Sequence, residues 1–239
     1  MHLDTRIKLF MFLIGVFVTA LVIGDIIGGK LVEVHLGSQA TIVSVGMIPF
    51  PITFLLTDIL NEFYGKSAAR YVTLVGFAMS LFCYAVIFAA VALPWAPLTR
   101  EAGYGGMVEA SFNNVFLGSQ RILVASMIAF LLGQFLDIGV FNLLKRVTSN
   151  RYLWLRATGS TVVSQLVDTI VIQCIAWWGI LSPGKVASLA LSSYVIKLLV
   201  AIGLTPLIYA GHTLVHRALG LAPIQLDANG EVIEGPPAL

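Results

Sequence analysis

Several residues with ionisable or amide side chains lie inside or at the ends of long apolar runs. They are Asp25, Asp58, Asn61, Glu62, Gln134, Asp137, Gln165, Asp168 and Lys197. Together they offer acceptors and donors for hydrogen bonds to a polar small molecule. In apolar surroundings an ionisable group costs several kcal/mol unless it faces a cavity or a partner. The alternative role is structural: ion pairs at the deeper positions, or, for Asp25 and Glu62, contact with the headgroups of a bilayer.

Two of these segments share a tetrapeptide pattern. Gln134-Phe135-Leu136-Asp137 and Gln165-Leu166-Val167-Asp168 each place an amide and a carboxylate at i, i+3, which is one face of a helix. On two consecutive antiparallel helices, the pairs would face a shared cavity with opposite polarity. This layout is expected of an inverted-repeat binding site near the midplane of a membrane. The repeat itself rests on one tetrapeptide.

Lys197 lies two turns before Thr205-Pro206 in an apolar run. An ammonium group there needs a countercharge. Asp168 is the candidate nearest in estimated depth, and Asp137 is the second.

Two prolines interrupt another apolar run, at Pro49 and Pro51. Each removes a backbone donor, so the sequence predicts a helix that is kinked or broken there. Irregular backbone at bilayer depth indicates a cavity or a transport site, although a purely structural kink is the alternative. Directly after the prolines, Thr57/Asn61 and Asp58/Glu62 form i, i+4 pairs on adjacent helix faces.

The composition indicates which elements hold these residues. The 239 residues are 58% hydrophobic and 11% charged, whereas soluble domains have about 25% charged residues. A bilayer crossing takes about 20 apolar helical residues. We therefore expect an all-α integral membrane protein with six transmembrane helices, the second of them broken at Pro49-Pro51. The expected spans are at about 9–29, 42–61, 70–93, 120–143, 158–180 and 188–214.

Basic residues set the expected orientation. Six crossings place both termini on one side, and a cytoplasmic assignment gives nine basic residues inside against four outside. The inner ones are Arg6, Lys8, Lys66, Arg70, Lys145, Arg146, Arg151, Arg156 and Arg217, and the outer ones are Lys30, Arg100, Arg121 and Lys185. We expect an outer loop over 94–119 with a short interfacial helix, a transmembrane domain over 1–219 and an irregular cytoplasmic tail over 220–239.

Other classes of function have weak support. The net charge of +2 and scattered basic residues suggest no nucleic-acid partner. His212 and His216 share a helical face but have no third ligand nearby in sequence, so no metal or other cofactor is expected. Gly179 to Lys185 mimics a phosphate-binding loop, yet Val186 replaces the required Ser or Thr. An enzyme is not expected, because no nucleophile and base are apparent.

A longer set of motifs carries a resemblance to known proteins. Its residues are Pro51-Ile52-Thr53, Thr57-Asp58-Ile59-Leu60-Asn61-Glu62-Phe63-Tyr64-Gly65-Lys66, Ala69-Arg70, Ala125-Ser126, Gly133-Gln134, Asp137, Ser164-Gln165, Asp168-Thr169, Tyr194, Lys197, Thr205-Pro206 and Tyr209. This set resembles the signature of the queuosine precursor transporters, also called the vitamin uptake transporter family. The family often has an amide before a lysine near the end of the first span, where this chain has Asp25 and Lys30.

The resemblance implies a multi-pass importer in the bacterial inner membrane for queuosine precursors, such as 7-cyano-7-deazaguanine or its aminomethyl relative. A carboxylate can accept from the two adjacent donors of a guanine-like edge, and an amide or lysine can donate to its carbonyl. The expected substrate-binding residues are Asp58, Asn61, Glu62, Gln134, Asp137, Gln165, Asp168 and Lys197. Phe50, Tyr194 or Tyr209 could stack on the ring, or serve only in packing.

Two further questions stay open at the level of sequence. A substrate-binding membrane subunit for a vitamin-like molecule, dependent on a separate ATPase module, is the alternative function. The chain could also form a homo-oligomer, since its glycines suit packing within or between copies.

Overall fold

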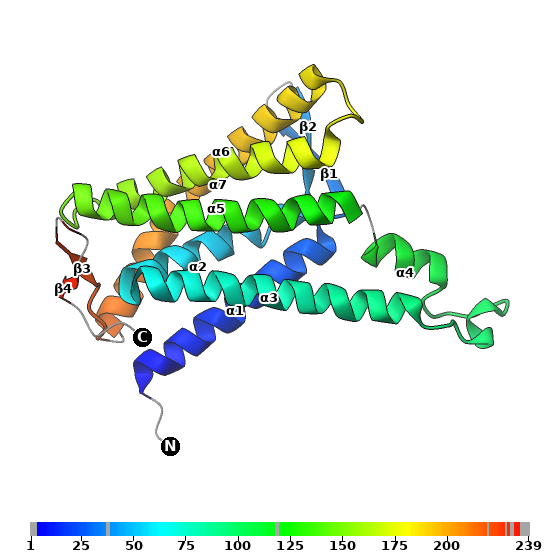
Figure 1. Cartoon of the computed structure of the whole chain (residues 1–239), viewed down its shortest axis with the longest axis horizontal. Coiled ribbons are helices and arrows are strands. Elements are labelled where there is room, and N and C mark those ends of the chain that lie inside the picture. Colours follow the sequence, from blue (N-terminus) through cyan, green and yellow to red (C-terminus); the bar gives the residue numbers. More distant parts are fainter. Residues whose placement is uncertain are drawn as a thin grey trace.

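Helices make up most of the chain in the computed structural model, which describes residues 4–36, 39–117, 120–218, 220–227, 229 and 232–234. They pack side by side in an elongated bundle (Figure 1). The helices are α1 (Thr5–Ile27), α2 (Phe50–Phe63), α3 (Gly65–Ala92), α4 (Glu109–Phe116), α5 (Gln120–Val147), α6 (Leu153–Trp177) and α7 (Pro183–Thr213).

Among the described residues, five helical segments have the length and apolar composition needed to cross a bilayer. They are Thr5–Ile27, Gly65–Ala92, Glu109–Val147, Leu153–Trp177 and Pro183–Arg217. Large apolar side chains such as Phe12 and Phe82 are 66% and 64% exposed on the bundle. Such exposure is expected of helices whose outer faces contact lipid, so the chain is a helical membrane protein.

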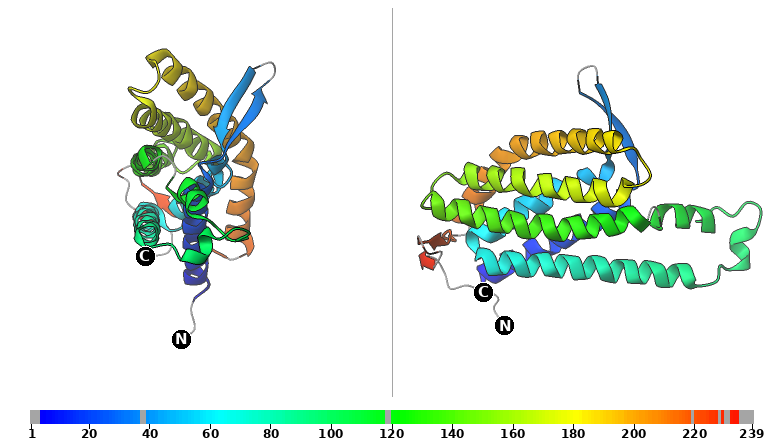
Figure 2. Two further views of the ribbon diagram at one scale, coloured as in Figure 1. Left: turned by 90° about the vertical axis from the view of Figure 1, so that its right-hand side faces the viewer. Right: turned by 45° about the horizontal axis from the view of Figure 1, so that its top comes forward.

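The structure does not form one continuous helix over 42–61, the second span expected from the sequence. Residues Leu31–Leu36 and Gln39–Ser44 form an antiparallel hairpin, β1 and β2, followed by a short 3-10 turn at Val45–Met47. Alternating and β-branched residues such as Val32, Val34 and Val43 favour strands over a helix here. The hairpin protrudes from the bundle (Figure 2).

The prolines begin α2 and do not interrupt it. Pro49 caps the helix and Pro51 lies in its first turn, where a missing backbone N–H needs no partner. The 14 residues of α2 extend for about 21 Å, which is shorter than the hydrocarbon core of about 30 Å. The predicted break of the second helix at Pro49-Pro51 is therefore wrong. The structure has a hairpin, a turn and a short helix in series.

Both ends of the described chain lie at the same end of the bundle. The first turn of α1, the turn between α5 and α6 and strands β3 (Gln225–Leu226) and β4 (Val232–Glu234) are on the left in Figure 1. The β1–β2 hairpin and α4 lie toward the other end. The cytoplasmic assignment of the first end stays a prediction.

The C-terminal segment is bound to the bundle and is more regular than expected. The Ile224 side chain is 2% exposed, and its backbone N–H donates to the Glu62 carbonyl at 2.9 Å. Asn150 donates to the carbonyl of Leu226 at 2.9 Å and accepts from its N–H at 3.0 Å. Residues 228, 230–231 and 235–239 of the expected tail lie outside the described residues, and the domain division at 219 stays a prediction.

The apolar core lies where α1, α2, α3 and α5 meet. Phe17, Leu60, Val72 and Ile138 are fully buried in it. Tyr64, between α2 and α3, donates to the Arg6 carbonyl at 2.7 Å and so fixes α1 against α2. These contacts hold the polar face of α2 toward α5 and α6.

Candidate functional site

A polar stripe runs along the buried face of α6. Its members, Arg156, Ser160, Ser164 and Asp168, recur every four residues and are all buried. Twelve residues of helix extend for about 18 Å. The stripe contacts charged or polar side chains of α2, α5 and α7, and so connects three groups of polar residues.

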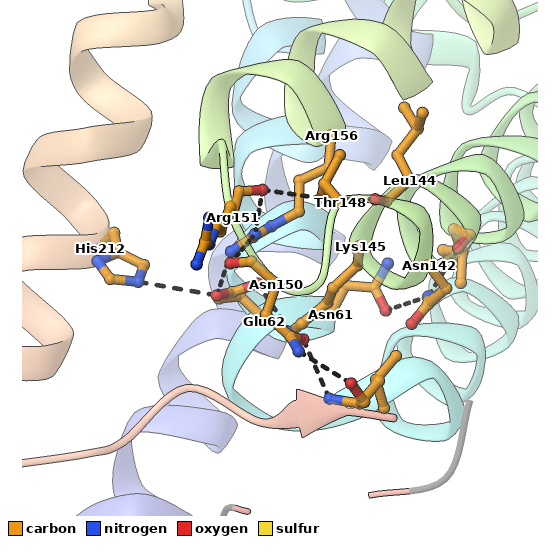
Figure 3. A network of polar contacts seen from close by, with 12 residues as sticks. Asn61, Glu62, Asn142, Leu144, Lys145, Thr148, Asn150, Arg151, Arg156 and His212 are labelled. Atoms are coloured by element: carbon orange, nitrogen blue, oxygen red, sulfur yellow. Dashed lines mark hydrogen bonds and ion pairs between the residues drawn. The ribbon is translucent and has the colours of Figure 1, made fainter. Parts of the chain in front are cut away.

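Glu62, Lys145 and Arg156 form the first group, which we name the Glu62 cluster (Figure 3). The two carboxylate oxygens of Glu62 lie 2.9 Å from Lys145 Nζ and 2.5 Å from Arg156 Nη2. The Glu62 side chain is only 4% exposed, so it does not reach lipid headgroups. His212 approaches the same carboxylate at 3.8 Å. One acid thus holds two buried cations from different helices.

Two amide and hydroxyl contacts join α2 to α5 deeper in the bundle. Asn142 Nδ2 donates to Asn61 Oδ1 at 2.7 Å. Thr57 Oγ1 lies 3.1 Å from Gln134 Oε1. Because these contacts lie on either side of Asp58 along α2, they fix its position relative to α5.

The repeated motifs of α5 and α6 face each other reciprocally. The Ser164 hydroxyl donates to Asp137 Oδ1 at 3.0 Å. Conversely, Asp168 of α6 lies against Gly133 of α5, where an added Cβ would stand 3.3 Å from the Cβ of Asp168. Each aspartate therefore packs against the small residue that directly precedes the motif of the other helix.

Lys197 pairs with Asp168, as the sequence predicted. The ammonium group contacts Asp168 Oδ2 directly, and both side chains are largely buried. It also lies 4.9 Å from the centre of the Phe50 ring, within the range of a cation–π interaction. This group joins α6, α7 and the first turn of α2.

A narrow crevice between α2, α6 and α7 opens beside this ion pair. Its empty space is about 400 Å³, part of it open to the surroundings. The polar residues that line it are Asp58, Thr158, Thr161 and Lys197, with Phe50 and Phe54 among the apolar ones. Gln134, Asp137 and Gln165 are not among its lining residues, and α5 contacts α6 directly at Asp137–Ser164 and Gly133–Asp168. A shared cavity between the two Gln/Asp motifs stays a prediction.

Several buried polar atoms have no hydrogen-bond partner in the described part of the chain. They include Asp58 Oδ1, Asp137 Oδ2, Asn61 Nδ2 and both amide atoms of Gln165. Most buried polar groups in proteins are paired, so each exception requires an explanation. A polar ligand bound between these helices would supply the missing partners.

Comparisons with known proteins agree with this architecture. The family model described as "Putative vitamin uptake transporter" matches residues 44–211. The chain belongs to the vitamin uptake transporter family. The match runs from the end of β2 to the last turns of α7 and contains all eight residues that the sequence predicted as substrate-binding.

Individual relatives of the family support the same assignment. The chain is 31% identical over 173 residues to the "Probable queuosine precursor transporter" of Bacillus subtilis (strain 168), covering 72% of each chain. It is 32% identical over 164 residues to the "Queuosine precursor transporter" of Escherichia coli (strain K12), covering 66% of each. The corresponding "Probable queuosine precursor transporter" of Haemophilus influenzae is 29% identical over 160 residues, 63% of its length. No solved structure matches the chain.

All eight predicted residues are buried, and the structure divides them among three levels of the vitamin uptake transporter fold. Glu62 lies in the Glu62 cluster, Asn61, Gln134 and Asp137 contact partners in the middle, and Asp168 pairs with Lys197. Asp58 faces the crevice, and the Gln165 amide has no hydrogen-bond partner among the described residues. Their role in binding substrate stays a prediction.

Sequence reasoning missed the buried roles of Lys145 and Arg156, which it placed among inner basic residues. The i, i+4 recurrence of Arg156, Ser160, Ser164 and Asp168 is the signal that indicates a buried polar face. Asp25, outside the matched region, accepts from Ser126 at 3.3 Å. Within the described residues, His, Cys, Asp and Glu form no group of three suited to a metal ion.

Proposed function

We propose that this chain imports queuosine precursors, 7-cyano-7-deazaguanine or its aminomethyl relative, across the bacterial inner membrane. The names of the relatives from Bacillus subtilis and Escherichia coli support this substrate class. The chain spans 63% to 72% of the length of the three relatives.

One observation carries the proposal: Asp58, with a carboxylate oxygen that has no partner in the described part of the chain, lines the same crevice as Lys197. A 7-deazaguanine ring presents two adjacent donors on one edge and a carbonyl beside them. A carboxylate accepts from the two donors, and an ammonium donates to the carbonyl. In our proposal Asp58 accepts from the substrate and Lys197 donates to it.

The aromatic residues in the first turns of α2, which line the crevice, favour a flat ligand. Phe50 lies beside the Lys197 ammonium and lines the crevice together with Phe54. Their rings are 4.7 Å apart, centre to centre. We propose that Phe50 stacks on the deazapurine ring when the substrate enters.

The other predicted residues have supporting roles in this proposal. Gln165 offers an unpartnered donor and acceptor, and Asn61 an unpartnered donor, so both could complete the contacts of the ring. Gln134, Asp137 and Asp168 hold these groups in place through Thr57, Ser164 and Lys197. Glu62 fixes the end of α2 through its two cations.

Queuosine in tRNA tests the function directly. A bacterium that can neither make nor import the precursor is supplied with 7-cyano-7-deazaguanine, with and without this gene. We expect queuosine only with the gene, and its loss in Asp58→Asn. Glu101→Gln, an exposed change in the loop between α3 and α4, is the matched control. Absence of queuosine, with the protein detected in the membrane, would contradict the proposed substrate.

Reconstitution of the purified chain separates this function from the ATPase-dependent alternative. We expect vesicles that contain only this chain to take up 7-cyano-7-deazaguanine without ATP. Uptake that requires ATP and a copurified ATPase would support the alternative.

A further inference from the structure

Four carboxylates are buried along the polar faces of α2, α5 and α6, and within the described residues two of them have cationic partners. Glu62 contacts Lys145 and Arg156, and Asp168 contacts Lys197. In the described part of the chain, no cation lies within ion-pair distance of Asp58 or Asp137. These two acids are 3% and 0% exposed.

Asp58 and Asp137 are also neighbours. They are close enough for their charges to repel each other. The Thr57–Gln134 and Asn61–Asn142 contacts lie before and after them on both helices. These flanking contacts place Asp58 of α2 and Asp137 of α5 at the same level of the bundle.

Each acid has an oxygen without a partner. Asp137 accepts from Ser164 on Oδ1, while its Oδ2 and Asp58 Oδ1 have none in the described structure. Among the described residues, two fixed negative charges here would have one hydroxyl donor, from Ser164, and no cation in ion-pair contact. Burial disfavours ionised carboxylates, and a neighbouring carboxylate disfavours them further.

Among the described residues, each charged group near the pair either repels it or is bound to another partner. On α2, Glu62 adds repulsion. On α5, Lys145 is bound to Glu62. On α6, Arg156 attracts Asp58, but its guanidinium bonds to Glu62 and to the Asn150 carbonyl.

The remaining neighbours are neutral or already paired. Ser160 and Ser164 of α6 face Asp137 with hydroxyl groups. On α7, Lys197 shares the crevice with Asp58 but is bound to Asp168. A proton is thus the simplest species that removes the unpaired charge.

We propose that the Asp58/Asp137 pair binds one proton, held by Asp137 while Asp58 accepts from the substrate, and that this proton crosses the membrane with each substrate molecule. The proton binds a carboxylate oxygen from the outer side and leaves for water on the cytoplasmic side, so one positive charge enters per neutral substrate. This coupling rests on the proposed import function. It gives the transporter a driving force that requires no ATPase.

Proteoliposomes that contain the full chain test the coupling without any variant. A pH-sensitive dye is enclosed, valinomycin and potassium clamp the membrane potential, and 7-cyano-7-deazaguanine is added outside in sodium-free buffer. We expect the substrate to enter together with about one proton per molecule, and an imposed inward proton gradient to accumulate it.

The outcomes separate this proposal from the function on which it rests. Substrate entry without proton movement, or accumulation driven by sodium alone, would overturn the proton proposal and leave the import function intact. No entry of substrate, by exchange or by net uptake, would contradict the import function itself.

Difference infrared spectroscopy of the purified protein locates the proton. We expect the carbonyl band of a protonated carboxyl group to weaken in both Asp58→Asn and Asp137→Asn and to persist in Asp137→Glu. Glu101→Gln should keep it, because this acid is exposed and lies in the loop between α3 and α4. A contribution from Asp25 is common to all variants and cancels. An unchanged band in both Asp58→Asn and Asp137→Asn would overturn the assignment.

Discussion

The backbone of Gly133 lies against the side chain of Asp168, where an added Cβ would stand 3.3 Å from the Cβ of Asp168. This close approach lets α5 and α6 meet along their polar faces. It also fixes Asp168 where Lys197 of α7 can reach it. The glycine directly before the α5 motif therefore positions an ion pair made by two other helices.

Substitution of Gly133 tests this contact. Gly133→Leu should displace Asp168 and abolish uptake, because overpacking costs about 1–3 kcal/mol and here moves a charged group. Gly139→Ala is the matched control on the same helix, since nothing lies within 4 Å of a Cβ added there. It should keep normal uptake and gain up to about 1 kcal/mol of helix stability. Equal uptake by Gly133→Leu and Gly139→Ala would contradict the positioning role.

Removal of the Glu62 charge should destabilise the protein strongly. Glu62→Gln leaves Lys145 and Arg156, which are 1% and 3% exposed, without a counterion. Loss of one partner from a buried ion pair costs about 3–5 kcal/mol. Thermal unfolding in detergent measures this loss, and the exposed Glu101→Gln should remain within about 0.5 kcal/mol of the wild type. A Glu62→Gln protein as stable as Glu101→Gln would show that the cluster contributes no stability.

The Asp168–Lys197 pair should behave as a coupled unit. Asp168→Asn or Lys197→Met alone leaves one buried charge unpaired and should cost about 3–5 kcal/mol. The double variant removes both charges and should recover much of that loss, although uptake stays absent because Lys197 no longer reaches the substrate. If the two losses simply add in the double variant, the pair does not stabilise the bundle.

The sequence was informative where a pattern reflects a local rule. The i, i+3 spacing of the two Gln/Asp motifs and the depth of Lys197 were enough to predict the facing of α5 and α6 and the Asp168–Lys197 pair. The sequence places Lys145 and Arg156 only among the inner basic residues. A charged residue near a helix end has the same sequence pattern whether its side chain is buried or exposed to water. Only the tertiary position of Glu62 shows that they are buried.

The second span illustrates another limit of sequence reasoning. Residues 42–61 are apolar enough for a transmembrane helix, but mean hydropathy does not distinguish one continuous helix from a strand followed by a shorter helix. Pro49 and Pro51 indicate a disturbed backbone, but proline is tolerated both at a kink and in a first helical turn. The β1–β2 pairing, which depends on contacts between Leu31–Leu36 and Gln39–Ser44, decides between them.

Asn150 should control whether the C-terminal segment stays bound to the bundle. It holds Leu226 by two hydrogen bonds and adopts a left-handed backbone with φ of 62°. Asn150→Gly keeps that backbone accessible and removes both bonds, each worth about 0.5–1.5 kcal/mol. A cysteine introduced as Ile224→Cys, with Cys83 and Cys174 replaced by alanine, reports the release by its reaction with an impermeant maleimide in inverted membrane vesicles.

Labelling should accelerate by about 5- to 150-fold in Asn150→Gly, which corresponds to about 1–3 kcal/mol. Ser149→Gly makes the same backbone change at the neighbouring left-handed position, where no side-chain bond to the described segment exists, and should react like the parent. If Asn150→Gly also reacts like the parent, the buried Ile224 side chain alone holds the segment. Because the reagent reaches only the cytoplasmic face of such vesicles, labelling solely in right-side-out vesicles would contradict the predicted cytoplasmic position of this end of the bundle.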